Sequence, residues 1–144
     1  MEFPIHIPFS QRLGFELLSM ADGVAQVAVD VDEAHLNSWS VAHGGVLMTL
    51  LDVAMAHAAR SIHVDQENFG PGVVTVEMKT SFMRPGEGRL VAEGRLLHRS
   101  TTMAFTEGRI TDADGKLCAH ATGTFKYLKA LPGRGRAVKS LRQT

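Results

Sequence analysis

The residue best suited to chemistry is Asp52, which lies within an otherwise apolar run of sequence. Its neighbours over residues 46–59 are mostly Met, Leu, Val and Ala, and no Lys or Arg lies within a helical turn of it. A carboxylate in such surroundings is costly unless it is paired, neutralised or solvated. It could hydrogen-bond to Thr49 or a nearby backbone N–H and serve packing alone. It could also be the base or nucleophile of a cleft.

The second candidate is the sequence His43-Gly44-Gly45, directly before this run. Glycines at a helix start leave backbone N–H groups unshielded, and the helix dipole makes that point attractive to negative charge. An oxyanion that develops on a carbonyl would be stabilised there. The simpler interpretation is that the glycines only permit a tight turn before the helix.

Gly44 and Asp52 are too far apart to act on one carbon atom within one subunit. Their separation of eight residues corresponds to about 12 Å along a helix axis. A two-fold dimer with its helices side by side would place Asp52 of one subunit opposite the helix start of the other. The spacing therefore predicts two composite sites per dimer.

Periodicity predicts the elements that must position these residues. Residues 13–20 and 23–31 form a hairpin, residues 46–61 form a helix that is apolar on nearly every side, and four strands follow over 73–83, 89–99, 103–111 and 116–128. We expect a meander of these later strands, with a strong turn at residues 112–115. The prediction is an α+β domain in which an antiparallel sheet packs against one helix, with association through the sheet edge or the helix layer.

Alternation within the strands predicts which faces meet the helix. Strand 73–83 places Val74, Val76 and Met78 on one face and Thr75 on the other. Strand 116–128 presents a face of mostly small residues that would let a helix lie close. That face consists of Leu117, Ala119, Ala121, Gly123 and Phe125.

Composition limits the class of protein. The 144 residues are 44% hydrophobic and 21% charged, which suits one compact domain. The single Cys118 excludes a disulfide framework or a multi-cysteine zinc site and fits a reducing compartment. The sequence starts without the features of a secretory leader, and its longest apolar run is too short to span a bilayer. We expect a soluble, cytoplasmic protein without membrane contact.

The net charge of zero conceals a basic C-terminal segment. Residues 129–144 carry five basic side chains and no acid, so residues 1–128 hold 10 basic and 15 acidic side chains. We expect a domain over 1–128 and a flexible tail over 129–144. Nucleic acid is not expected as a partner, because the body is acidic and aromatic residues are not interleaved with the basic ones.

The spacing of Asn37, His43-Gly44-Gly45 and Asp52, followed by the strand VVTVEM, resembles the hotdog-fold acyl-CoA thioesterases. These belong to the 4-hydroxybenzoyl-CoA thioesterase superfamily, and the closest branch is that of phenylacetate degradation (PaaI-like). The resemblance covers residues 10–128, including LGFELLSMADGVAQV near the start and the closing hairpin. It implies a hotdog fold, a homodimer or homotetramer, and hydrolysis of an acyl-CoA substrate without metal or cofactor.

The resemblance also implies a role for each matched residue. Asp52 would be the general base or nucleophile, and the two routes stay open. The Gly44 N–H would polarise the thioester carbonyl, while Asn37 and His43 orient the water or the thioester. Thr75 would help to hold water beside Asp52 of the same subunit.

Coenzyme A brings phosphates, which bind to Arg, Lys or N–H groups. Arg84, Arg99, Ser100 and Thr101 lie at strand ends that border the nucleotide in the family. The alternative for each residue is that it lies at a solvated strand end and does not bind coenzyme A. Trp39 and Phe69 could line an acyl pocket or pack beneath a loop.

Three other functions compete with a thioesterase. A non-catalytic, regulatory acyl-CoA-binding hotdog protein would more often lack the acid. A hotdog hydratase or dehydratase places its acid differently relative to a histidine, and position 56 here is Ala. A purely structural oligomer gives no reason for Asp52. The other histidines lack the spacing of metal ligands.

Overall fold

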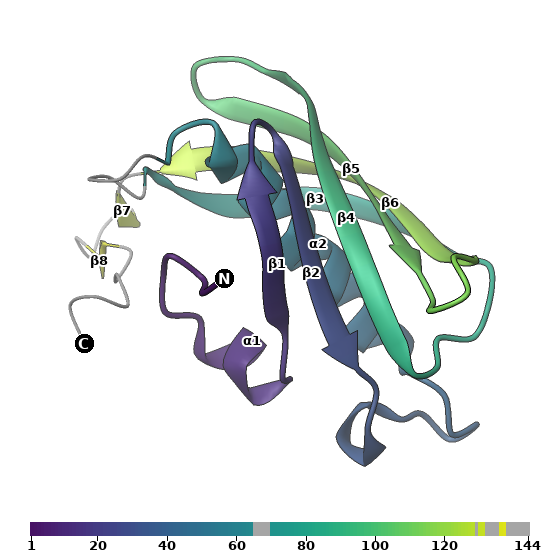
Figure 1. The fold of residues 1–144 in the computed structure, drawn as a ribbon. Helices are drawn as coiled ribbons and strands as arrows, with labels where there is room; N and C mark the ends of the chain where they lie inside the picture. The colour runs from purple at the N-terminus through teal and green to yellow at the C-terminus, as the bar shows by residue number, and fades with distance from the viewer. Residues whose placement is uncertain (65–69, 129, 132–135, 138–144) are drawn as a thin grey trace.

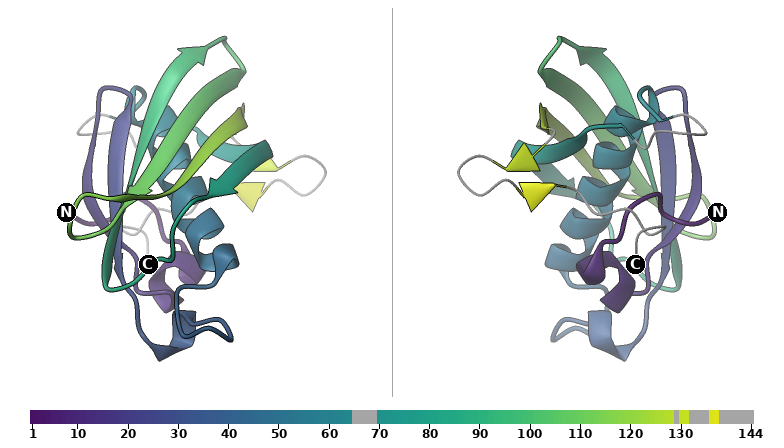
Figure 2. Two further views of the ribbon diagram at one scale, coloured as in Figure 1. Left: turned by 90° about the vertical axis from the view of Figure 1, so that its right-hand side faces the viewer. Right: turned by 90° about the vertical axis from the view of Figure 1, so that its left-hand side faces the viewer.

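A computed structural model of the chain describes residues 1–64, 70–128, 130–131 and 136–137 (Figure 1). One long helix, α2, lies against a six-stranded antiparallel sheet that curves around it (Figure 2). This confirms the predicted α+β arrangement. The elements are α1 (Pro8–Arg12), β1 (Glu16–Ala21), β2 (Val24–Asp30), η1 (Glu33–His35), α2 (Gly44–Ser61), β3 (Gly72–Phe82), β4 (Arg89–Arg99), β5 (Met103–Thr111), β6 (Leu117–Leu128), β7 (Ala130–Leu131) and β8 (Arg136–Ala137).

The strand order is β1-β2-β4-β5-β6-β3, so the prediction of one meander after the helix is wrong for its first strand. Strands β4, β5 and β6 do form consecutive hairpins, but β3 pairs with β6 at the far edge of the sheet. The chain then crosses from this edge to the middle of the sheet to begin β4. Backbone hydrogen bonds hold this crossing to the loop before α2, from Val31 N to Gly88 O at 2.9 Å and from Ala42 N to Gly86 O at 2.9 Å.

Three glycines set the distance between helix and sheet. Gly94 of β4 and Gly108 of β5 are register partners, and Gly123 of β6 follows on the next strand. A Cβ atom at Gly94 would lie 2.4 Å from the Ala54 carbonyl oxygen, and one at Gly123 would lie 3.0 Å from the Met55 methyl carbon. The missing side chains let α2 lie directly on the strands, as the small face of β6 predicts.

Strand β3 departs from simple alternation. Its register with β6 shifts between Thr75 and Glu77, which is the effect of a β-bulge. Thr75 therefore reaches Asp52 on α2, while Met78, three residues later, packs against the core and Val76 is 55% exposed. The predicted grouping of Val76 with Met78, opposite Thr75, is wrong because the inserted residue changes the face of everything after it.

Most element boundaries lie close to the predictions. The helix begins two residues earlier, at Gly44. Strand β1 begins three residues later, at Glu16, because Leu13 caps the end of α1 and Gly14 follows with a left-handed φ of 74°. The turn at 112–115 is confirmed, with Asp112 Oδ1 accepting from Asp114 N and Lys116 N at 2.9 Å each.

The predicted flexible tail over residues 129–144 falls mostly outside the described residues, and it stays a prediction. Within it the structure gives only the short antiparallel pair of β7 with β8. Among the described helices, none is both long enough and apolar enough to cross a membrane.

Candidate active site

The Asp52 carboxylate is held by one side chain from the sheet. Thr75 of β3 donates its hydroxyl to Asp52 Oδ1 at 2.6 Å. Burial raises the pKa of Asp52 above its ordinary value, and the hydrogen bond from Thr75 lowers it by a smaller amount. A half-buried carboxylate with one oxygen fixed by a neutral hydroxyl keeps its second oxygen available as a base or nucleophile.

Asp52 lies in the wall of a groove of about 400 Å³ formed by three elements. The N-terminal segment with α1, the middle of α2 and strand β3 each contribute side chains, most of them apolar. Figure 2 shows α1 beside α2. The lining residues are Ile7, Phe9, Ser10, Met48, Thr49, Asp52, Val53, Thr75 and Met78. The arrangement offers an acidic group at the wall of an apolar groove.

His43 caps the helix start. Its Nδ1 accepts the Gly45 N–H at 2.8 Å, while its own carbonyl accepts from Val46 and Leu47. The N–H of Gly44, the first helical residue, has no acceptor among the described residues. The ring of His43 therefore occupies the Gly45 N–H, and the Gly44 N–H stays available at the positive end of the helix dipole. An oxyanion would be stabilised there.

Asn37 shapes the loop that leads to the helix. Its side-chain oxygen accepts from Trp39 N at 2.9 Å and Val41 N at 3.3 Å, and Ser40 adopts a left-handed φ of 61°. Because the oxygen is occupied, the Asn37 amide can only donate to a ligand. Trp39 is 84% exposed and does not line the Asp52 groove. Phe69 lies outside the described residues.

Within one subunit the structure does not bring the two halves of the site together. Asn37, His43 and Gly44 lie at the start of α2, whereas Asp52 and Thr75 lie more than two turns along it, about 12 Å away on the helix axis. The face of α2 that carries Asp52 is only partly covered, since Met48, Thr49 and Ala56 are half-buried.

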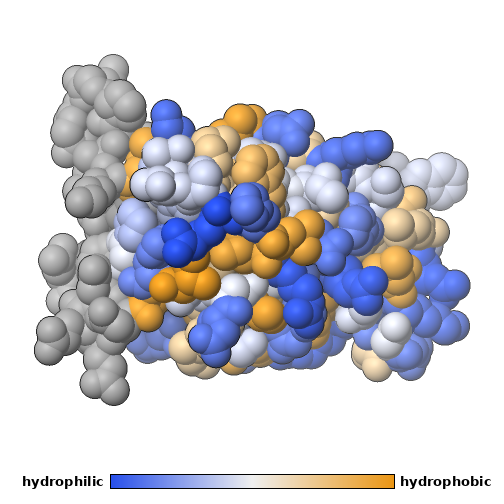
Figure 3. Space-filling view, turned by 90° about the horizontal axis from the view of Figure 1, so that it is seen from above, coloured by the Kyte–Doolittle hydropathy of each residue, from blue (hydrophilic) through white to orange (hydrophobic). Residues whose placement is uncertain are grey.

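The four candidate coenzyme A ligands lie at opposite ends of β4. Arg84 follows β3, and its N–H bonds to Cys118 O at 3.2 Å, near the start of α2. Arg99 ends β4 and acts electrostatically on His63, just beyond the end of α2. Ser100 Oγ accepts from Met103 N at 3.0 Å, and Thr101 follows in the same connection. The end of the molecule with this connection mixes hydrophilic and hydrophobic surface (Figure 3).

Two buried histidines hold structural positions. His57 is 2% exposed, with Nδ1 at 2.7 Å from Val53 O, and burial lowers its pKa to about 4. His35 is buried, and its Nδ1 accepts from Asp32 N. Within the described part of the chain, no cluster of three His, Cys, Asp or Glu side chains could hold a metal ion.

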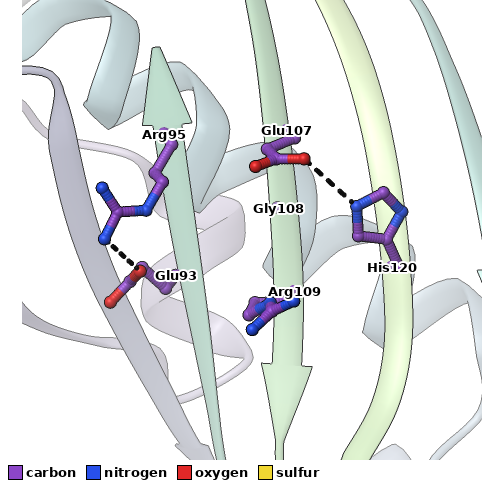
Figure 4. A pocket seen from close by; sticks show the side chains of 6 residues that line it. All are labelled: Glu93, Arg95, Glu107, Gly108, Arg109 and His120. Atoms are coloured by element: carbon purple, nitrogen blue, oxygen red, sulfur yellow. Dashed lines mark hydrogen bonds and ion pairs between the residues drawn. The ribbon is translucent and has the colours of Figure 1, made fainter. Parts of the chain in front are cut away.

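A second hollow lies on the outer face of the sheet, away from α2 (Figure 4). Its acidic groups are paired, Glu93 with Arg95 at 3.1 Å and Glu107 with His120 at 3.4 Å. Its lining residues all come from strands, so no helix end reaches it, and Asp52 does not line it. The groove beside Asp52 is therefore the candidate active site.

Sequence reasoning missed the contribution of the N-terminal segment. Ile7, Phe9 and Ser10 line the groove opposite residues that were identified from the sequence. A signal was present, because Pro8 occupies the first turn of α1, where proline is favoured. A helix of five residues is too short to show a helical period.

Comparisons with known proteins identify relatives of this chain. The model of the thioesterase superfamily matches residues 40–119. The medium/long-chain acyl-CoA thioesterase YigI of Salmonella typhimurium is 27% identical over 135 residues, which cover 85% of this chain and 87% of that protein.

Two solved structures share the fold. The conserved protein PA5202 of Pseudomonas aeruginosa matches with a TM-score of 0.78 and 31% identity, over 87% of this chain and 97% of that one. The PaaI protein of the Escherichia coli phenylacetic acid degradation operon matches with a TM-score of 0.75 and 27% identity, over 83% of each chain. The expected hotdog fold and the resemblance to its thioesterases are confirmed. The chain belongs to the thioesterase superfamily.

Proposed function

We propose that this protein hydrolyses acyl-CoA thioesters to the free acid and coenzyme A. The observation that carries the proposal is the Asp52 carboxylate, held by Thr75 at the wall of an apolar groove in a chain of the thioesterase superfamily. Water adds its oxygen to the thioester carbon, the bond from that carbon to sulfur breaks, and the proton lost by water passes to the leaving thiolate. Asp52 carries that proton if it acts as the base.

The oxyanion formed in this step needs donors, and the unpaired Gly44 N–H at the helix start is the proposed one. His43 fixes the backbone at this position through its bond to the Gly45 N–H. Asn37 presents its amide N–H₂ to the water or the thioester. These groups bind the thioester carbonyl or the water. Asp52 either attacks the carbon of that carbonyl or activates the water that attacks it.

The active unit is a homodimer, which pairs again into a homotetramer. The separation of about 12 Å between Gly44 and Asp52 requires the helix start of one subunit beside Asp52 of the other. The half-buried face of α2 and the edge strand β3 are the surfaces that support this pairing.

The dimer would also reunite the candidate coenzyme A ligands. Antiparallel helices bring the end of one α2, near Arg99, beside the start of the other, near Arg84. Arg84, Arg99, Ser100 and Thr101 would then surround one nucleotide from two subunits. Replacing Arg84 or Arg99 by Gln should raise KM for acyl-CoA more than it lowers kcat.

The test is release of coenzyme A, followed with a thiol reagent, from a panel of aryl and aliphatic acyl-CoA thioesters. Wild type should turn over at least one of them, and Asp52→Asn should fold, bind and lose about 10²-fold to 10⁴-fold in kcat. Unchanged turnover in Asp52→Asn would remove Asp52 from the mechanism. Binding without turnover in wild type would support a regulatory protein instead.

An isotope experiment on the wild-type enzyme distinguishes Asp52 as a general base from Asp52 as a nucleophile. Single turnover in ¹⁸O-labelled water places label directly in the free acid if Asp52 activates water. If Asp52 attacks the thioester, a mixed anhydride forms, and water attack at its Asp52 carbonyl leaves the label in the enzyme. Mass spectrometry of the peptide that contains Asp52 measures this.

A further inference from the structure

Four charged side chains form a square on the outer face of the sheet, which is turned away from α2 (Figure 4). Glu93 and Arg95 are two residues apart on β4, and Glu107 and Arg109 are two residues apart on β5. The strand register places Glu93 beside Arg109, and Arg95 beside Glu107. Opposite charges therefore alternate both along the strands and across them. We call these four side chains the charge square.

The four charges differ in how far they are paired within the chain. The Glu93 carboxylate is held by Arg95 at 3.1 Å and by a side-chain amide of β2 at 2.9 Å. The Glu107 carboxylate has only the imidazole of His120, at 3.4 Å. Arg109 makes no ion pair with any residue that the structure describes. Glu107 and Arg109 are therefore the members of the charge square that can still take a partner of opposite charge.

The shape of the sheet makes this square the natural point of contact for a second sheet. The sheet curves around α2, so its outer face is convex (Figure 2). Two convex faces meet only near their middle, and β4 and β5 are the third and fourth strands of the six. The charge square also surrounds a hollow of about 230 Å³ that side chains of a partner could enter.

The charge square is complementary to a second copy of itself. Consider a two-fold axis that lies between two such faces, runs across the strands and passes between the two rows of the square. Glu107 then lies opposite Arg109 of the partner subunit, and Glu93 lies opposite Arg95 of the partner subunit. The symmetry repeats each of these contacts. Sheets that cross at a right angle would instead place like charges opposite each other.

An axis along the strands would also oppose unlike charges, but with less to gain. It would place Arg109 opposite Glu93 of the partner subunit, and both oxygens of Glu93 are already bonded. The axis across the strands matches Arg109, which has no ion pair among the described residues, with Glu107, whose carboxylate has one weak partner.

We propose that the charge square is an interface between two copies of this chain, in which Glu107 of each copy forms an ion pair with Arg109 of the other. The homodimer of the proposed function uses α2 and β3 and leaves the outer face of the sheet free. This inference rests on that dimer and names the surface through which two dimers pair into a tetramer.

Sedimentation measures the assembly across a range of concentrations. Wild type should form tetramers, and Glu107→Arg should remain a dimer, because the substitution places two positive charges opposite each other twice in every interface. The dissociation constant of the two dimers should rise by about 10²-fold or more. Arg109→Glu should have the same effect with negative charges. Glu33→Arg is the matched control, since Glu33 is exposed on η1, away from the sheet, and it should keep the tetramer.

Mixing two variants tests which charges face each other. Glu107→Arg and Arg109→Glu should each be dimeric alone and should form mixed tetramers together, because each supplies the charge that the other lacks. Native mass spectrometry identifies these tetramers by their mass. Glu107→Arg mixed with Arg95→Glu should stay dimeric. Mixed tetramers in that second mixture, in place of the first, would overturn the proposed pairing of Glu107 with Arg109.

The proposal also fails if wild type forms no tetramer at any concentration, or if the tetramer survives Glu107→Arg. A failure to recover tetramers in the mixture of Glu107→Arg with Arg109→Glu would overturn it as well, since misfolding of either variant would have to be shown by circular dichroism to explain that result. Release of coenzyme A from acyl-CoA is measured on the same wild-type samples. Tetramers without hydrolysis refute the thioesterase function alone, and hydrolysis by dimers refutes this interface alone.

Discussion

Acid should destabilise this protein through His57, an imidazole buried between α2 and the N-terminal segment. The residue is 2% exposed, and its ring makes an edge contact with Phe3 at 5.0 Å between centroids. Burial lowers its pKa to about 4, the hydrogen bond to Val53 O opposes this shift, and the charge of Arg60 adds to it. The folded protein therefore holds His57 neutral at pH values where the unfolded chain protonates it.

The sign and size of the effect follow from linkage. Above pH 6.5 His57 is neutral in both states and contributes nothing. As the pH falls from 6.5 to about 4, only the unfolded chain gains the proton, so the free energy of unfolding decreases. The difference between 6.5 and about 4, at about 1.4 kcal/mol for each pKa unit, amounts to about 3 kcal/mol.

The perturbation is His57→Leu, which keeps an apolar side chain in the core and cannot be protonated. Denaturant unfolding of both proteins at several pH values gives the difference between their free energies of unfolding, and contributions from other groups cancel. We expect this difference to move by about 3 kcal/mol in favour of His57→Leu between pH 7 and pH 4.

His98→Leu is the control for replacing an imidazole, because His98 is exposed on β4. A difference between wild type and His57→Leu that is constant with pH would refute the reasoning. The reasoning would also be refuted if, at low pH, the free energy of unfolding of wild type rose relative to that of His57→Leu.

Two further predictions concern Asp52 and the contact of helix with sheet. Thr75→Val removes the hydrogen bond that lowers the pKa of Asp52, so the acidic limb of the pH dependence of kcat/KM should move to higher pH; an unchanged limb would contradict this. Gly94→Ala should lower the free energy of unfolding by about 2 kcal/mol or more, because its Cβ would lie 2.4 Å from the Ala54 carbonyl oxygen. Gly108→Ala meets only flexible side chains of α2 and should cost less, and the reverse order in denaturant unfolding would refute this account of the packing.

The helix and its carboxylate could be predicted because their signals are local. An apolar run predicts that the segment is buried. A single acid within that run is costly to bury, so it indicates a functional or a hydrogen-bonded carboxylate. The small face of β6, with Ala119, Ala121 and Gly123, likewise predicts a closely packed helix without reference to other strands.

The pairing of β3 could not be predicted from periodicity. Alternation identifies a strand but carries no information on its neighbour, and consecutive strands usually pair. Here the short crossing from β3 to β4 is fixed by distant backbone groups, including Ala42 N with Gly86 O. The bulge after Thr75 is hidden for a similar reason, because it exists only relative to the partner strand.

The Ser10 wall of the groove was also beyond sequence reasoning. Nothing around Ser10 in the chain distinguishes it from a surface serine, yet in the fold it is only 1% exposed. Tertiary contact alone gives this hydroxyl its environment.

The placement of methionines provides the protein with its own spectroscopic reporters. Met55 extends its methyl group toward the position where Gly123 lacks a side chain, next to the ring of Phe125, so ring current should shift its ¹³C-methyl resonance. Met48 and Met78 line the groove beside Asp52. Methyl-labelled methionine would therefore give separate signals for helix docking and for groove occupancy in one spectrum, without any engineered probe.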